Sequence, residues 1–352
     1  MRVGHVLLNV VVAAGILLAA EGWCSLGEAL PKYRLSSTLG YELVPGFVGR
    51  HETVNLAGLR GAEIGPKRPG SFRILAMGGS TTWGHKVSDD ETWPVALERE
   101  LRAATGRDIE VLNGGVSGWD IEQFVVALRQ SHLQLFQPDL VVVFAGWNDP
   151  RIDSAVCRHA RTDVLAAQRR DGLYRSALVR RLARAIRDWR SAGADAPAAV
   201  PMPGLVMERN RVYPPLYAEL RRLCDEHGAR VVSLRFPCLI QRPPPSEPGA
   251  LARYEEPLRN NLGGEHDVAG LIEIARERWT TGIDAVVSAS TQAGIEILDV
   301  ATRLESELPA TDTETTWSGY FKDHAHFTPA GDAALGRALA GILLERQLVP
   351  GH

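Results

Sequence analysis

The segment FRILAMGGSTTWG, residues 72–84, decides the fold. Its first six residues form a short apolar run, and the glycine-rich part that follows carries Ser80. A helical pattern comes next, from Trp93 to Ala104. An apolar run, a loop and a helix in this order are typical of α/β sheets, which place their ligands at the carboxyl ends of parallel strands.

The same alternation continues along the chain. Fully apolar runs suit parallel strands that are covered on both faces, and strands that alternate with helices predict a layered α/β domain. The chain is therefore expected to be an α/β protein, a three-layer α/β/α sandwich with a central, mostly parallel sheet. The further units predicted are strand 109–112 with helix 121–133, strand 140–145, helix 214–227 with strand 230–234, and helix 283–293 with strand 295–300.

The domain organisation follows from where this pattern begins and is interrupted. Residues 71–350 are predicted to form one domain, with inserts at about 151–204 and 241–264 that carry Ala/Pro-rich and Pro-rich stretches. Residues 23–70, rich in glycine, proline and polar residues, show no sustained period and are interpreted as a lead-in that packs on the domain.

Residues 1–22 indicate export, because Arg2 precedes an apolar run from Val6 to Ala20. The run is short for a full membrane span of about 20 residues, which favours a cleaved signal peptide. Leu18, however, fits poorly at the third position before a cut after Ala20, so an uncleaved signal anchor is the expectation. In both cases the positive-inside rule predicts a periplasmic or otherwise extracytoplasmic domain, held to the cytoplasmic membrane if the segment is uncleaved. A buried amino-terminal helix of a soluble protein is the remaining alternative.

Composition excludes one class of partner. The 352 residues carry a formal net charge of −3, without the basic excess usual in nucleic-acid-binding proteins, so no nucleic-acid partner is expected. The four cysteines have none of the paired spacings of zinc sites. Cys224 and Cys238 are either buried thiols or, after export, a disulfide.

Three predicted strands end in loops whose residues suit acyl transfer. Ser80 follows the first strand, the glycine-rich segment 113–118 follows the second, and Asn148 follows the third. Glycine lets the backbone turn sharply and bring its amides close to a substrate, and a side-chain amide can donate to a developing oxyanion. Each loop alone is also compatible with an ordinary tight turn. The Ser80 loop lacks the Gly-Lys-Ser/Thr ending of a nucleotide-binding loop, which argues against nucleotides.

Asp323 and His326 stand three residues apart, just before a last helix that Thr328 can cap and Pro329 can open. This spacing lets both side chains converge in a turn, where the carboxylate holds the imidazole in one tautomer while its other nitrogen faces a serine. The competing interpretation makes His324 and His326 metal ligands, but no distant cluster of ligands completes such a site. No metal and no cofactor are therefore predicted.

Together the four segments resemble the four sequence blocks of the SGNH (GDSL-like) hydrolase superfamily, in the family's order and over about residues 71–348. The resemblance implies the SGNH (flavodoxin-like) form of the three-layer sandwich and a catalytic triad of Ser80, Asp323 and His326. It also implies an oxyanion hole made by the backbone amides of Ser80 and Gly118 and the side chain of Asn148.

One position departs from the family's pattern. Gly79 precedes the serine where the family has the aspartate of Gly-Asp-Ser-Leu, and such Gly-Gly-Ser-Thr-Thr variants resemble exported or membrane-anchored bacterial members. His85 and His324 are interpreted as structural histidines. Trp83, Trp119 and Trp147 either narrow the pocket and stack on a sugar or pack in the core.

The function expected from these residues is a serine esterase that acts through an acyl-serine intermediate. Its expected substrate is a small-molecule or carbohydrate ester, above all a short-chain O-acetyl ester of a cell-envelope carbohydrate. Two alternatives remain: an O-acyltransferase on the same scaffold, and a non-catalytic, membrane-anchored glycan-binding protein.

Overall fold

The computed structural model describes residues 2–25, 32–148, 178, 202–238, 267–307, 319–323 and 325–351. The predicted insert 241–264 lies outside the described residues, as does 151–204 apart from residues 178 and 202–204. His324 also lies outside them.

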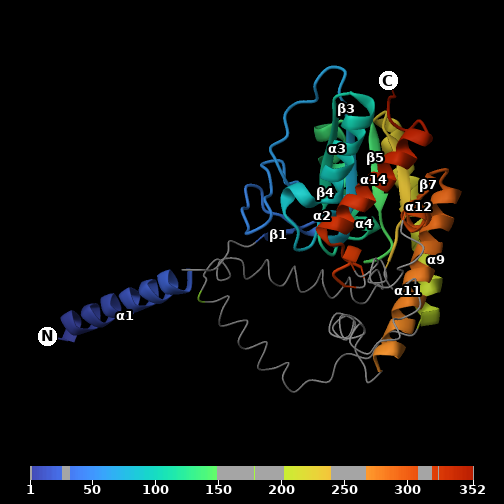
Figure 1. The fold of residues 1–352 in the computed structure, drawn as a ribbon. Coiled ribbons are helices and arrows are strands. Elements are labelled where there is room, and N and C mark those ends of the chain that lie inside the picture. The colour runs from blue at the N-terminus through green and yellow to red at the C-terminus, as the bar shows by residue number, and fades with distance from the viewer. Residues whose placement is uncertain are drawn as a thin grey trace.

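A five-stranded sheet forms the centre of the molecule, and all of its neighbouring strands run parallel (Figure 1). The predicted parallel sheet is therefore confirmed. Its strands, in spatial order, are β4 (Ile109–Gly115), β3 (Phe72–Gly78), β5 (Leu140–Phe144), β6 (Arg230–Arg235) and β7 (Glu296–Asp299).

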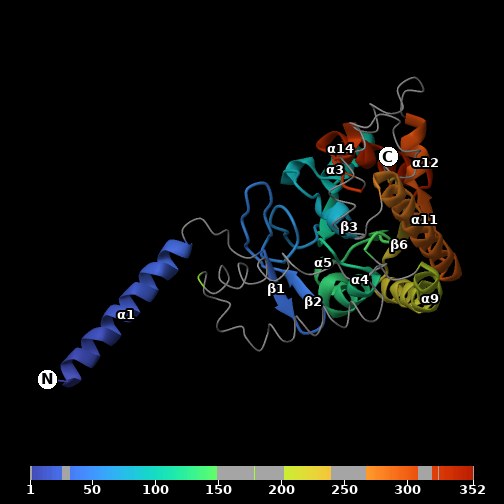
Figure 2. The same ribbon diagram turned by 90° about the horizontal axis from the view of Figure 1, so that it is seen from below.

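Helices cover both faces of this sheet, as seen from below in Figure 2. Successive strand side chains point to opposite faces, so Ile74 and Ala76 of β3 join one buried cluster while Leu75 and Met77 join the other. The three-layer sandwich is confirmed. The first face is covered by α3 (Trp93–Thr105), α12 (Val300–Glu307) and α14 (Pro329–Glu345), the second by α4 (Ile121–Ala127) and α9 (Met202–Glu226), and α11 (Val268–Gln292) contributes to both clusters.

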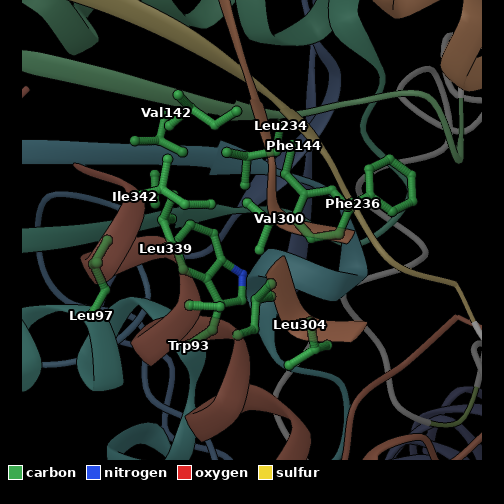
Figure 3. Close-up of a cluster of buried hydrophobic side chains, with 14 of the residues drawn as sticks. Trp93, Leu97, Val142, Phe144, Leu234, Phe236, Val300, Leu304, Leu339 and Ile342 are labelled. Carbon is green, nitrogen blue, oxygen red and sulfur yellow. The ribbon is translucent and has the colours of Figure 1, made fainter. Parts of the chain in front are cut away.

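The first cluster is drawn in Figure 3, where the Trp93 indole lies among aliphatic side chains from α3, α12, α14 and the strands. Trp93 is fully buried, and α14 packs along α3 beside it. This contact matters for the site, because α14 directly follows the segment that carries Asp323 and His326.

Two helices begin earlier than predicted. The α9 helix begins at Met202 instead of Pro214, and α11 begins at Val268 instead of Ile283. The added part of α11 buries Leu271, Ile272, Ala275 and Trp279, and the Asp267 carboxylate caps it by accepting from the Gly270 amide.

The predicted helix 121–133 consists of three pieces. After α4 the chain makes a π-helical turn, Leu128–His132, and then α5 (Leu133–Phe136). Gln137 ends the helix with a left-handed backbone, φ 48°.

The lead-in contains a two-stranded antiparallel hairpin, β1 (Tyr33–Ser36) with β2 (Gly40–Leu43), which the sequence did not predict. Further along, the buried Arg60 guanidinium donates to the backbone carbonyls of Trp83, Gly84 and Val87 and pairs with Asp89. The lead-in is thereby attached to the segment that follows the nucleophile.

The amino-terminal helix α1 (Arg2–Ser25) projects away from the sheet domain in both ribbon views (Figures 1 and 2). Several of its apolar side chains are exposed, namely Val11, Val12, Ile16, Leu17 and Leu18. By length and hydropathy, no helix within the described residues meets the requirement for crossing a membrane. The cellular location remains a prediction.

Cys224 and Cys238 are both buried and form no disulfide, so the thiol alternative holds for this pair. Burial raises the pKa of the Cys224 thiol to about 12. A neutral thiol packed in the core is an inert apolar group and not a nucleophile. Cys157 lies outside the described residues.

Candidate active site

The sheet order explains why loops distant in sequence meet. The strand β3 lies between β4 and β5, and Gly78 at its carboxyl end is level with Gly115 on one side and Phe144 on the other. The chain goes from β3 to β4 on one side and from β5 to β6 on the other, which is where α/β sheets form a binding crevice. The predicted loops therefore open at one edge.

Ser80 begins α2 (Ser80–Trp83), a single turn directly after Gly78 and Gly79. A side chain at Gly79 would collide with the amide nitrogen of Asn148. In this structure Asn148 therefore fills the space that a side chain at residue 79 would need.

The turn that carries Asp323 and His326 is held by its own backbone. Phe321 and Phe327 form an antiparallel bridge with their rings 4.8 Å apart, and the Lys322 amide donates to the His326 carbonyl at 2.8 Å. Within the turn, Asp323 Oδ1 accepts the amides of Ala325 and His326, each at 2.9 Å. This is the local geometry of an aspartate that caps a turn.

The helix that follows begins as the sequence predicted. The Thr328 hydroxyl accepts from the Gly331 amide at 3.1 Å, and Pro329 occupies the first turn of α14. The cap fixes where the turn ends and α14 starts.

The three predicted triad residues meet in one hydrogen-bonded chain. His326 Nδ1 lies 2.8 Å from Asp323 Oδ2 and 3.0 Å from Oδ1, and His326 Nε2 lies 2.8 Å from Ser80 Oγ. With the carboxylate as acceptor, Nδ1 carries the proton, so Nε2 presents its lone pair to the serine hydroxyl. This is the arrangement that activates a serine for nucleophilic attack.

Asn148 is oriented by the glycine-rich loop after β4. Its amide nitrogen donates to the carbonyl of Trp119 at 2.9 Å and lies against Gly79, next to the nucleophile. A side-chain amide carries two N–H donors, so one holds the orientation while the second remains for a ligand beside Ser80. Gly118, in the same loop, has a φ of 86°, which glycine adopts without strain.

The His85 ring lies against the catalytic histidine, with 4.9 Å between the ring centroids of His85 and His326. Burial, followed by the charges of His326 and Lys86, lowers the pKa of His85 to about 4. The His85 side chain is therefore neutral near pH 7 and provides a packing surface, as predicted for a structural histidine.

Lys322 connects the histidine turn to the nucleophile segment. Its ammonium donates to the backbone carbonyls of His85 and Lys86, at 3.0 and 2.7 Å. No sequence pattern marks Lys322, because both acceptors are main-chain atoms more than 230 residues away.

Two of the three tryptophans belong to the core and not to a sugar platform. Trp83 and Trp119 are 1% and 3% exposed, whereas Trp147 is half-buried. Trp83 is covered by cations of the lead-in, with Lys32 Nζ 4.6 Å and Arg60 Cζ 4.8 Å from ring centroids. For Trp83 and Trp119 the prediction of stacking on a sugar is therefore wrong, and the alternative of packing in the core holds.

The described residues hold no group of three or more potential metal-ligating side chains. His324, one half of the competing metal interpretation, lies outside them.

Comparison with known families agrees with this geometry. Residues 76–257, about half of the chain, match the GDSL-like lipase/acylhydrolase family. The chain belongs to this family. The matched region contains Ser80, Gly118 and Asn148 and ends before Asp323 and His326, which the fold brings to the serine. This GDSL-like protein is thus a serine hydrolase that acts on carboxylic esters.

Solved structures with a similar fold are distant in sequence. One is a putative lipolytic protein of the G-D-S-L family from Desulfitobacterium hafniense, with 14% identity over 77% of this chain and 99% of that chain, at a TM-score of 0.40. A second is the aryl esterase of M. smegmatis, with 17% identity over 79% and 100%, at 0.41. A third is the acetylxylan esterase Axe2 from Geobacillus stearothermophilus, with 14% identity over 78% and 93%, at 0.40. No curated protein matches.

Proposed function

We propose that this GDSL-like hydrolase removes short acyl groups, above all acetyl, from a cell-envelope carbohydrate through an acyl-serine intermediate. The observation that carries the proposal is the chain of hydrogen bonds from Asp323 through His326 to Ser80 Oγ, with both links at 2.8 Å. Such a chain of hydrogen bonds lets the serine hydroxyl pass its proton to the histidine while its oxygen attacks a carbonyl carbon.

The first half of the reaction forms the acyl-enzyme. Ser80 Oγ attacks the ester carbonyl carbon while His326 Nε2 takes the hydroxyl proton, and Asp323 stabilises the imidazolium that results. When the tetrahedral intermediate collapses, the bond to the leaving alcohol breaks and Nε2 returns the proton to its oxygen. In the second half, water attacks the acyl carbon while His326 Nε2 takes a proton from the water. The bond to Ser80 Oγ then breaks, Nε2 returns the proton to Oγ, and the acid is released.

Negative charge develops on the carbonyl oxygen in both halves. The amides of Ser80 and Gly118 and the side chain of Asn148 are assigned to this oxyanion, since donors that are oriented beforehand stabilise the transition state without reorganisation.

The short acyl group is proposed from the surroundings of the nucleophile. Polar side chains adjoin Ser80: His326 accepts from its hydroxyl, His85 packs on His326, and Asn148 lies against Gly79. Long acyl chains need an apolar wall to replace water, whereas an acetyl group needs little.

An extracytoplasmic location is part of the proposal. It rests on Arg2 ahead of the apolar run and on the exposure of apolar side chains along α1. Protease added to spheroplasts should digest the domain, and its protection would contradict export. The size of the mature chain shows whether the segment is cleaved or stays as an anchor.

The test of the reaction is labelling by a fluorophosphonate probe, compared between the wild type and Ser80→Ala. The wild type should be labelled, and the variant should lose both labelling and about 10⁴-fold in turnover, the usual cost of losing a triad member. Ser131→Ala, a change at an exposed serine, is the matched control. Labelling that persists in Ser80→Ala would exclude Ser80 as nucleophile.

The substrate and the rival reactions are tested with one ester panel. Turnover should fall from acetyl to butyryl to octanoyl esters, and a preference for octanoyl would contradict the short acyl group. Added sugar acceptors that divert the acyl group from water would favour the acyltransferase. Activity that is lost in a chelator and restored by zinc would favour the metal interpretation.

A further inference from the structure

The lead-in hairpin contacts the loop that carries Gly118. The Tyr41 hydroxyl donates to the Ser117 carbonyl at 2.8 Å, and the Trp119 indole N–H donates back to the Tyr41 carbonyl at 3.0 Å. A third bond runs from the Gln123 side chain to the Leu39 carbonyl at 2.6 Å. These contacts join residues about 80 positions apart in sequence.

We propose that Tyr41 is a positioning residue for the oxyanion hole. Its hydroxyl holds the peptide unit between Ser117 and Gly118 in the orientation that the Gly118 amide needs to donate to the oxyanion. The inference rests on the proposed function, because it gives Tyr41 a role in that same reaction.

The argument begins with the geometry of a peptide unit. The Ser117 carbonyl and the Gly118 N–H belong to one planar trans peptide, in which C=O and N–H point in opposite directions. A donor on the carbonyl side therefore fixes the direction of the N–H on the other side. It also polarises the unit, which strengthens the N–H as a donor.

The loop by itself leaves this peptide unit free to rotate. Residues 116–119 form a β-turn closed by the Trp119 amide and the Val116 carbonyl at 3.0 Å, with Gly118 in third position at φ 86°. A type II turn needs this sign of φ, and rotation of the central peptide converts it into type I. Because glycine adopts either sign easily, sterics do not prevent the rotation.

The hydrogen bond from Tyr41 selects one of the two orientations. The Ser117 side chain makes no bond that holds this peptide unit, since its buried Oγ has no hydrogen-bond partner among the described residues. The hydroxyl also limits the space at the turn, because a Cβ at Gly118 would lie 2.5 Å from Tyr41 Oη.

The same hairpin also supports the second proposed donor. The Trp119 carbonyl accepts from the Asn148 amide, and the Trp119 indole is held by the Tyr41 carbonyl. Tyr41 thus contacts the second and the fourth residue of the turn, Ser117 and Trp119, and so acts on both the Gly118 amide and the orientation of Asn148.

The test is Tyr41→Phe, which removes the hydroxyl and keeps the ring. Active sites are titrated with the fluorophosphonate, so that rates refer to folded enzyme only. With 4-nitrophenyl acetate, kcat is expected to fall about 10- to 100-fold, less than the 10²- to 10³-fold cost of deleting one oxyanion donor. KM should change less than about twofold, because the oxyanion exists only in the transition state.

Tyr33→Phe is the matched control. It removes a hydroxyl from the neighbouring strand, where the Tyr33 ring packs edge-on against Tyr41 with centroids 5.6 Å apart. The kcat of Tyr33→Phe should equal that of the wild type. In Tyr41→Phe the rate of labelling by the fluorophosphonate should fall together with kcat, and in Tyr33→Phe it should not.

The outcomes distinguish failure of the role proposed for Tyr41 from failure of the proposed esterase reaction. An unchanged kcat in Tyr41→Phe, or a fall in kcat that Tyr33→Phe shares, would overturn the role of Tyr41 and leave the esterase intact. Absence of Ser80 labelling in the wild type would overturn the esterase and the inference together. The expected split between kcat and KM supports both.

Discussion

Gly79 and Asn148 occupy the same small space beside the nucleophile, since a side chain at Gly79 would collide with the Asn148 amide. The space that Gly79 leaves open is thus filled by a residue from the loop that follows a different strand, β5.

We predict that Gly79→Ala lowers kcat about 10²-fold or more, because the new methyl group displaces an oxyanion donor. Asn148→Ala should cost a similar factor, about 10²- to 10³-fold. The double variant should be no worse than Asn148→Ala alone, since both changes remove one interaction. Gly65→Ala, where an added Cβ meets nothing within 4 Å, serves as control. Costs that multiply in the double variant would show that Gly79 acts independently of Asn148.

We predict that His85→Phe keeps kcat/KM within about threefold of the wild type. The His85 side chain, with a pKa of about 4, is neutral over the working range and contributes a ring packed on His326, which phenylalanine also provides. The measurement is the profile of kcat/KM from pH 5 to 9. A shift of its acid limb by a unit or more would mean that His85 titrates together with the catalytic histidine.

We predict that Asp332→Asn removes a loss of stability that the wild type shows as pH rises from about 4 to 8. Burial raises the pKa of the Asp332 carboxyl to about 8, against the opposing effects of the Trp93 amide, Lys322 and Arg60. The folded state then holds a proton that the unfolded chain releases near pH 4, so the free energy of unfolding falls as pH rises from about 4 to 8.

The measurement is urea unfolding of both proteins at pH 5 and pH 9. The wild type should lose at least about 1 kcal/mol more than Asp332→Asn, the equivalent of less than one pKa unit. The depressed pKa of His85 acts below pH 6.5 in the opposite direction, but it is common to both proteins and cancels. Parallel changes in the two would mean that Asp332 is ionised in the folded state.

Local patterns predicted the sheet and the pairing of Asp323 with His326, because both depend on neighbours in sequence, whereas the resemblance to the SGNH blocks assigned Ser80 as the third member of the triad. The run Leu140–Phe144 is apolar at every position, as a strand covered on both faces must be. Asp323 and His326 are three residues apart, so one turn is enough to join them. The parallel direction of the strands then brought Ser80 and Asn148 to one edge without any further information.

Local sequence patterns did not predict the hairpin of the lead-in or its contact with the loop that carries Gly118. Strands Tyr33–Ser36 and Gly40–Leu43 have four residues each, too few for an alternating pattern to be recognised. Their partners lie far along the chain, as for Tyr41 and Ser117, 76 positions apart. Trp83 was ambiguous for a similar reason, because the cations that cover it come from Lys32 and Arg60 of the lead-in.

The position of the base 246 residues after the nucleophile has a consequence for biosynthesis. A growing chain can complete the sheet strand that presents Ser80 long before His326 has left the ribosome, and until then the hydroxyl has no proton acceptor. Closing so long a loop depends on α14 docking against α3, where the Trp93 amide meets Asp332. Nascent chains that have not yet released His326, and chains truncated before it, therefore lack the general base and cannot hydrolyse esters through this triad.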